Sequence, residues 1–254
     1  MASYIGRHAE VYDIFYADKP YGREAEFVHN CLQKYGAGEV RSLIELACGT
    51  GSHALVLEKL GYRITALDYS ADMLARARQK VAANSAIDFR LGDMTAFELE
   101  NKPFDAAVCL FDSIGYVQTN AAIKRVFVSV RDHLRSGGLF IFEFWHAAAM
   151  LRSYEPLRVR RWSVPAGELL RISQTTLECA EQLSRVAYSI YELNQDGTYS
   201  SLHETQVNRY FLVQEMADLL TDCGLTPVKW FSGFNDTEPV NENTWHIVAV
   251  ARKE

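Results

Sequence analysis

The chain has 254 residues, 48% of them hydrophobic and 12% aromatic, and 26 Lys and Arg against 32 Asp and Glu leave a net charge of −6. This length suits one large domain or a core domain with an insertion, and it can bury a core that needs no disulfide or metal. The acidic balance excludes a general nucleic-acid binder, which needs a basic surface.

The strands and helices that the apolar periodicity predicts alternate through the first half of the chain. In chain order they are a helix at 21–35, a strand at 43–47, a helix at 52–60, a strand at 64–68, a helix from the N-cap Ser70 to Val81, strands at 87–91 and 105–111, a helix at 123–134 ended by Gly137-Gly138, and a strand at 139–142. The strands at 105–111 and 139–142 are apolar throughout, which is typical of strands buried on both faces.

The pattern changes after Trp145. Residues 158–211 alternate between polar and apolar side chains, and residues 194–197 (NQDG) have the composition of a hairpin turn. This alternation predicts a small antiparallel meander. A helix and an antiparallel pair of strands are expected after it, at 214–223, 227–232 and 244–251.

Strands separated by helices predict an α/β fold with a doubly wound, mostly parallel Rossmann-like sheet. We expect an antiparallel β insertion after the fifth strand and a helical lid before the first. The expected boundaries are a lid at 1–40, a cofactor-binding domain at 41–146 and 213–254, and the β insertion at 147–212. The insertion is expected to form the pocket of the second substrate or a homodimer face.

The five cysteines are scattered, and no two have the spacing of a zinc-ligand or redox pair. We therefore expect reduced thiols and no metal site. The beginning of the sequence lacks the apolar segment of a signal peptide, and no segment reaches the roughly 20 apolar residues of a membrane span. These features predict a soluble, cytoplasmic protein with no membrane or nucleic-acid partner.

The strongest motif follows the first strand, at residues 45–51 (ELACGTG). Two glycines at a strand-to-helix turn allow a ligand to approach the backbone closely, and the helix N-terminus adds positive potential. Asp68 ends the next strand, where its carboxylate can accept both hydroxyls of a ribose. These features fit either a nicotinamide cofactor or S-adenosylmethionine (SAM).

Two details favour SAM. The third glycine of the dinucleotide fingerprint is replaced by Ala54, and no Tyr-x-x-x-Lys sequence is present for hydride chemistry. After the third strand, Asp93 can accept a hydrogen bond from an adenine amino group while Met94 packs on the ring.

In this order, the motifs at 45–51, 67–70 (LDYS), 92–94 (GDM), 104–111 (FDAAVCLF) and 134–138 (LRSGG) resemble those of the class I SAM-dependent methyltransferases, over about residues 40–145. The resemblance implies that Glu45, Gly49 and Gly51 hold the methionine end of SAM and that Asp68 holds the ribose. It places Asp93 and Met94 at the adenine, and Leu110 or Phe111 near the sulfonium. The expected cofactor-binding residues are Tyr12, Tyr21, Glu45, Ala47, Gly49, Gly51, Asp68, Tyr69, Met73, Asp93, Met94, Leu110 and Phe111.

The flanking segments are similar to the deoxyaminosugar N,N-dimethyltransferases of macrolide biosynthesis. The similar segments are 11–13 (VYD), 19–21 (KPY), 23–25 (REA), 70–74 (SADML), 111–116 (FDSIGY) and 203–204 (HE), together with Arg209. This narrower resemblance implies an amine acceptor on a nucleotide-linked sugar, with S-adenosylhomocysteine as the second product. The open alternatives are an O- or C-methyltransferase of another small metabolite and a SAM-binding protein without catalysis.

Methyl transfer from a sulfonium is an in-line displacement, so alignment of donor and acceptor is the main task of the enzyme. The catalytic candidates are Tyr12 in the lid, Tyr116 after the fourth strand, and Glu143 and His146 at the end of the fifth. Ligands bind at the carboxyl ends of strands in such sheets, and a carboxylate inside an apolar strand is costly without a partner. The remaining histidines, His246 among them, are expected to be structural or solvated.

Overall fold

The computed structural model describes residues 4–254, so the first three residues of the expected lid lie outside the described part. In chain order the elements are α1 (Arg7–Phe15), α2 (Tyr21–Tyr35), β1 (Ser42–Leu46), α3 (Ser52–Lys59), β2 (Arg63–Asp68), α4 (Ala71–Lys80), β3 (Ile87–Leu91), β4 (Phe104–Cys109), the 3-10 turn η1 (Ser113–Tyr116), α5 (Asn120–His133), β5 (Leu134–Trp145), α6 (Ala147–Ser153), β6 (Leu157–Val164), β7 (Gly167–Glu178), β8 (Leu183–Asn194), β9 (Tyr199–Arg209), α7 (Val213–Thr221), β10 (Leu225–Ser232) and β11 (His246–Lys253).

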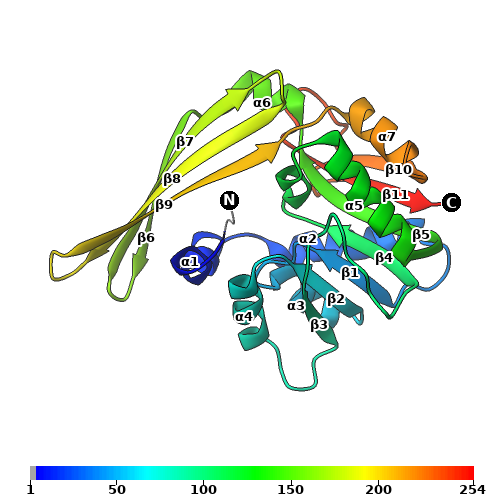
Figure 1. The fold of residues 1–254 in the computed structure, drawn as a ribbon, viewed down its shortest axis with the longest axis horizontal. Coiled ribbons are helices and arrows are strands. Elements are labelled where there is room, and N and C mark those ends of the chain that lie inside the picture. Colours follow the sequence, from blue (N-terminus) through cyan, green and yellow to red (C-terminus); the bar gives the residue numbers. More distant parts are fainter. Residues whose placement is uncertain (1–3) are drawn as a thin grey trace.

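These elements form two sheets, as Figure 1 shows. The larger sheet has the strand order β10-β11-β5-β4-β1-β2-β3, and the strands from β5 to β3 run parallel. The smaller sheet, β6-β7-β8-β9, is antiparallel and projects to one side of the larger sheet. The predicted fold class is confirmed.

Helices cover both faces of the larger sheet. On one face α2, α3 and α4 pack against the strands, and on the other face α5 and α7 do so. The amphipathic pattern of α5 explains its position, because Ile123, Phe127 and Val130 recur at helical spacing and are completely buried. The apolar strand β4 is buried from Ala106 to Cys109, as expected for a strand covered on both faces.

β5 begins earlier than predicted. Leu134, expected to be helical, pairs with Phe104 of β4, and the two glycines that were expected to end the helix lie inside β5. The register between the strands shifts after Phe104, and Gly137 has a φ of 73°. A glycine takes up this irregular backbone without the steric cost of a Cβ atom, so here it marks a bend in a strand.

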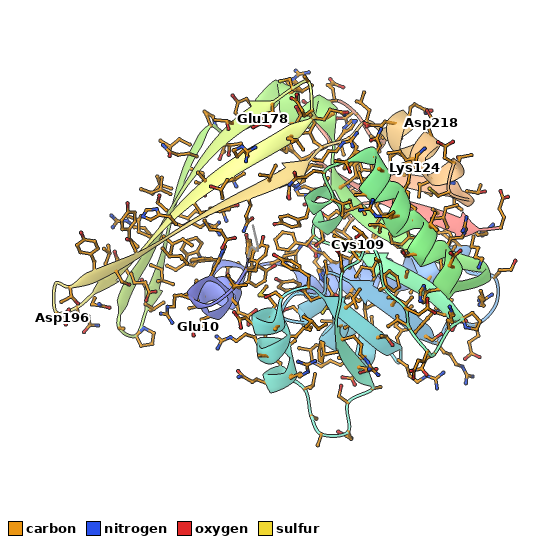
Figure 2. The ribbon with its side chains drawn as sticks, viewed as in Figure 1. Glu10, Cys109, Lys124, Glu178, Asp196 and Asp218 are labelled. Carbon is orange, nitrogen blue, oxygen red and sulfur yellow. The ribbon has the colours of Figure 1, made fainter. Side chains whose placement is uncertain are left out.

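The antiparallel sheet and the final strand pair match the alternation predicted for them. Asp196, labelled in Figure 2, marks the hairpin between β8 and β9 at the end of the sheet far from the larger one. One face of the antiparallel sheet is buried against α1. On this face Leu169 and Ile190 pack with Val11 and Phe15 of the helix. β11 pairs with both β5 and β10, antiparallel to each. Among residues 4–254, no helix is long and apolar enough to cross a membrane.

Candidate active site

The chain order around β1 creates a crevice at the carboxyl ends of the parallel strands. β1 lies between β2 and β4, so the connections that follow β1 and β4 leave to opposite sides of the sheet. Ligands of open α/β sheets bind at such a switch point, where the two loops part. The loop after β1 carries the glycine motif, and the loop after β4 carries Phe111 and Asp112.

A pocket occupies this crevice and extends between α1 and the antiparallel sheet. It encloses about 740 Å³ that no protein atom fills, its open mouth included. The predicted site residues that line it are Tyr12, Ala47, Gly49, Asp68, Tyr69, Met73, Phe111 and Tyr116. The lining residues that the sequence analysis did not predict are Tyr4, Tyr16, Asp112, Ser113, Trp145, Val186, Tyr188, Gln206 and Asn208.

The glycine turn and Asp68 form the cofactor side of the pocket. The backbone N–H groups of Gly49 and Ser70 donate to the Asp68 carboxylate at 2.7 and 2.8 Å, which fixes its orientation. Burial raises the pKa of Asp68, and these two donors oppose that shift. Gly51 has a φ of 75°, and a Cβ atom there would lie 3.1 Å from the ring of Phe89. Gly51 therefore serves the packing of α3 as well as the turn.

Glu45 lies beneath the turn and is completely enclosed. Its Oε2 has no hydrogen-bond partner, and burial together with the nearby Asp68 raises its pKa to about 8. Burial therefore favours the neutral form of this carboxyl group. A buried carboxyl group without a partner fits a positively charged ligand group, which would stabilise its ionised form.

The predicted adenine contacts lie away from the lining residues. Asp93 is exposed and accepts a hydrogen bond from the backbone N–H of Thr95 at 2.7 Å. Met94 is half-buried and packs against the core on the α5 side of the sheet. Leu110 is buried in the core on the opposite side. A role of these three residues in binding SAM stays a prediction.

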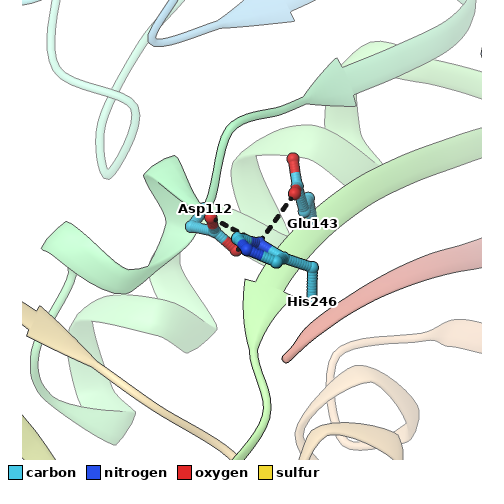
Figure 3. Close-up of side chains that lie close together, drawn as sticks. All are labelled: Asp112, Glu143 and His246. Atoms are coloured by element: carbon cyan, nitrogen blue, oxygen red, sulfur yellow. Dashed lines mark hydrogen bonds and ion pairs between the residues drawn. The ribbon is translucent and has the colours of Figure 1, made fainter. Parts of the chain in front are cut away.

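Phe111 and Asp112 form a turn in which both residues have left-handed backbone, with φ values of 58° and 54°. The Phe111 N–H donates to Oε2 of Glu143 at 2.6 Å. His246 Nδ1 lies 2.9 Å from the Asp112 carboxylate and 3.0 Å from that of Glu143, as Figure 3 shows. Two consecutive non-glycine residues in this conformation are costly, so the surrounding contacts must hold them.

The group of Asp112, Glu143 and His246 has the spacing of a metal site, since its ligand atoms lie within 4.8 Å of one another. In the described part of the chain the three side chains form an ion triad. The distances from Nδ1 to the carboxylates are those of hydrogen bonds, and the charge of Asp112 is the main cause that raises the pKa of His246 to about 11. The triad therefore anchors the Phe111–Asp112 turn to β5 and β11.

The structure separates the two catalytic candidates of β5 from the pocket lining. Glu143 lies behind the turn, and burial raises its pKa. His146 is buried, its Nδ1 lies 3.1 Å from the Thr244 carbonyl oxygen, and burial lowers its pKa. In these positions Glu143 supports the turn, and His146 connects the start of α6 to the loop before β11.

The lid closes over the glycine turn from α1. The Thr50 hydroxyl donates to the Asp13 carboxylate at 2.6 Å, and Lys80 of α4 forms an ion pair with the same side chain at 2.6 Å. Tyr21, predicted to bind the cofactor, packs edge-on against His53 behind the turn, with 4.8 Å between the ring centroids. Tyr12 does line the pocket, in contact with the rings of Tyr4 and Tyr16.

Four tyrosines from three parts of the chain surround the far half of the pocket: Tyr4, Tyr16, Tyr116 and Tyr188. The hydroxyl of Tyr116 hydrogen-bonds to that of Tyr4 and, at 3.1 Å, to Oε1 of Gln206. Burial raises the pKa of Tyr116 well above its usual value, so this phenol stays neutral. Beside it, Oδ1 of Asn208 is buried without a partner among the described residues.

The comparisons with known proteins agree with this geometry. A family described as a methyltransferase domain matches residues 43–138. A Streptomyces fradiae protein named dTDP-3-amino-3,6-dideoxy-alpha-D-glucopyranose N,N-dimethyltransferase is 31% identical over 181 residues, which are 70% of this chain and 68% of that protein. The chain belongs to the class I SAM-dependent methyltransferases.

Two further similar proteins match this chain over more than nine-tenths of its length. A putative methyltransferase of Bacillus subtilis is 27% identical over 231 residues, 91% of this chain and 90% of that protein. The crystal structure of a SAM-dependent methyltransferase from Clostridium acetobutylicum superposes with a TM-score of 0.82 at 21% identity, covering 97% and 98% of the two chains. That structure supports the fold, including the antiparallel sheet, and SAM is the methyl donor of this family.

Proposed function

We propose that this methyltransferase transfers the methyl group of SAM to the amine nitrogen of a small polar acceptor, namely an amino sugar linked to a nucleotide. The observation that carries the proposal is the continuity of the pocket. It runs from the cofactor residues Asp68 and Met73 to Tyr116, and then to Gln206 and Asn208 of the antiparallel sheet. The Streptomyces fradiae relative, named an amino-sugar N,N-dimethyltransferase, supports the amine.

The cofactor half of the pocket lies at the carboxyl ends of the parallel strands. When bound, SAM supplies an electrophilic methyl group on a sulfonium. We assign the ribose hydroxyls to Asp68, whose carboxylate the backbone already orients, and the positively charged methionine end to Glu45 and the glycine turn. Tyr12 covers this half from the lid and excludes water from it.

The acceptor half offers hydrogen bonds and aromatic faces more than a strong base. The Tyr116 phenol stays neutral, and the His146 imidazole is bonded to a backbone carbonyl outside the lining. An amine that arrives unprotonated needs only alignment and a hydrogen-bond acceptor for its N–H. We assign the latter role to Asp112, a buried residue of the pocket lining. The tyrosine rings stabilise the positive charge that passes from sulfur to nitrogen.

Incubation of the purified protein with SAM and separate acceptors, followed by mass spectrometry, tests the proposal. The acceptors are a thymidine-diphosphate amino sugar, glycine, sarcosine and catechol. We expect one or two methyl groups on the amino sugar, and loss of turnover in Asp112→Asn while SAM binding persists. Methylation of catechol alone would replace the proposal with O-methylation. Tight SAM binding with no methylated product would leave a binding protein without catalysis.

A further inference from the structure

Arg171 of β7 is a buried cation without a counter-ion. Only 6% of the residue is exposed, and its Nε is sealed from solvent without a hydrogen-bond partner. Its guanidinium forms no hydrogen bond or ion pair with any residue of the range 4–254. Arginine has five N–H donors, and a buried charge is strongly unfavourable unless it is paired.

Four aromatic rings surround the guanidinium, and two of them also line the pocket. Its carbon Cζ lies 4.8 Å from the ring centroid of Phe15, 5.1 Å from Trp162, 5.3 Å from Tyr188 and 5.6 Å from Tyr16. Tyr16 and Tyr188 are lining residues, so the cation lies directly behind one wall of the acceptor half. Cation–π contacts hold the guanidinium plane in place but supply no hydrogen-bond acceptor to its N–H groups.

The carboxylates near this wall are already engaged. Glu204, on the same face of the antiparallel sheet, binds His8 and accepts hydrogen bonds from Gln206 and the Tyr4 backbone. Directly opposite Arg171 in the sheet stands a second arginine, Arg160, and not an acid. The described protein thus presents uncompensated positive charge beside an acceptor pocket.

We propose that Arg171 binds an oxyanion of the acceptor, a phosphate or a carboxylate, through paired N–H donors. This inference rests on the proposed function only in placing the acceptor in this half of the pocket. Guanidinium binds both anions with two parallel hydrogen bonds, and the shielding of the site strengthens the attraction. The accepted substrates are therefore amines that carry an oxyanion, such as nucleotide-linked sugars or amino acids, and neutral amines are excluded.

The test measures anion binding without turnover. The protein is saturated with S-adenosylhomocysteine, so that the cofactor half is filled, and inorganic pyrophosphate or sodium acetate is titrated by calorimetry. The variant is Arg171→Met, which keeps the long side chain and removes the charge. The matched control is Arg185→Met, because Arg185 lies in β8 of the same sheet and forms its ion pair with the partly exposed Glu178. Binding of S-adenosylhomocysteine reports that each variant is folded.

We expect at least one anion to bind the wild type, with affinity roughly tenfold or more lower in Arg171→Met and unchanged in Arg185→Met. Preference for pyrophosphate indicates a phosphate-bearing acceptor, and preference for acetate a carboxylate-bearing one. Equal binding by wild type and Arg171→Met overturns the proposal, as does the binding of neither anion. If Arg171→Met does not fold, Arg171→Lys, which keeps the charge but loses the planar donors, must show weakened binding of the anion. The anion titrations do not depend on turnover. Their outcome would therefore stand even if none of the amines in the acceptor panel were methylated.

Discussion

Glu45 and Asp68 place two carboxyl groups at the ends of neighbouring parallel strands, and none of the residues 4–254 forms an ion pair with Glu45. The pKa of Glu45 is raised because burial and the charge of Asp68 both disfavour ionisation. Between its ordinary value near 4.5 and the folded value of about 8, the group is neutral when folded and ionised when unfolded. The stability of the ligand-free protein should therefore fall as the pH rises through this window, and level off above it.

Replacement of Glu45 by Gln removes this titration. We expect the ligand-free variant to gain about 1–3 kcal/mol at pH 8, because an ionised group no longer lies buried without a partner. SAM binding should change in the opposite direction. The wild-type affinity should rise by up to about tenfold per pH unit towards pH 8, and the variant should bind more weakly with no such rise.

Urea denaturation and calorimetric SAM titration at pH 6, 7 and 8 measure both effects. Glu98→Gln is the control, since Glu98 is an exposed residue paired with Lys102, and it should behave as the wild type. A pH-independent SAM affinity in the wild type would contradict the assignment of Glu45 to the methionine end.

At the scale of elements, α1 connects the two sheets. Its Asp13 contacts the glycine turn and α4, whereas His8 hydrogen-bonds to Glu204 of β9 and Arg7 forms an ion pair with Glu192 of β8. The two pairs differ in exposure: the His8 and Glu204 side chains are 3% and 13% exposed, against 51% and 22% for Arg7 and Glu192. Because surface pairs contribute little, the buried pair is the one expected to hold the lid.

This difference predicts the effect of removing each charge. Glu204→Gln should lower the free energy of unfolding by about 1–3 kcal/mol and weaken S-adenosylhomocysteine binding, because the buried His8 loses its carboxylate hydrogen-bond partner. Glu192 lies in the same sheet and also contacts α1. Glu192→Gln should change the free energy of unfolding by less than about 1 kcal/mol. Urea denaturation and limited proteolysis of residues 4–20 measure the two effects. Equal effects of the two substitutions would show that the buried contact between His8 and Glu204 does not hold the lid.

At the scale of the whole molecule, the pocket exists only where three segments meet: the lid, the strand ends and the antiparallel sheet. The domain boundaries at 1–40, 41–146 with 213–254, and 147–212 stay a prediction, as does a homodimer. The strands of the antiparallel sheet, from Leu157 to Arg209, fall within the expected insertion. Binding of the cofactor should therefore stabilise the entire chain and not one part of it.

Saturation with S-adenosylhomocysteine tests this coupling. At a ligand concentration of 100 times Kd, binding adds about 2.7 kcal/mol to the free energy of unfolding. For a chain of this size we expect a rise in Tm of about 5–10 °C, in a single transition. Differential scanning calorimetry with NAD as the control ligand measures the rise. No shift with S-adenosylhomocysteine would contradict the cofactor, and two transitions of which one moves would contradict the coupling.

The sequence by itself determined the alternation of strands and helices, the class of methyl donor and much of the pocket, because these features depend on local periodicity and short motifs. Gly49 follows β1 and Asp68 ends β2, and the parallel pairing of these two consecutive strands brings them together. Only the tertiary structure decided which distant side chains meet. His246 contacts Asp112 across 134 residues, and Arg171 of the antiparallel sheet contacts Tyr16 at the end of α1. No local pattern encodes such contacts, since strand register and the packing of the lid against the antiparallel sheet produce them.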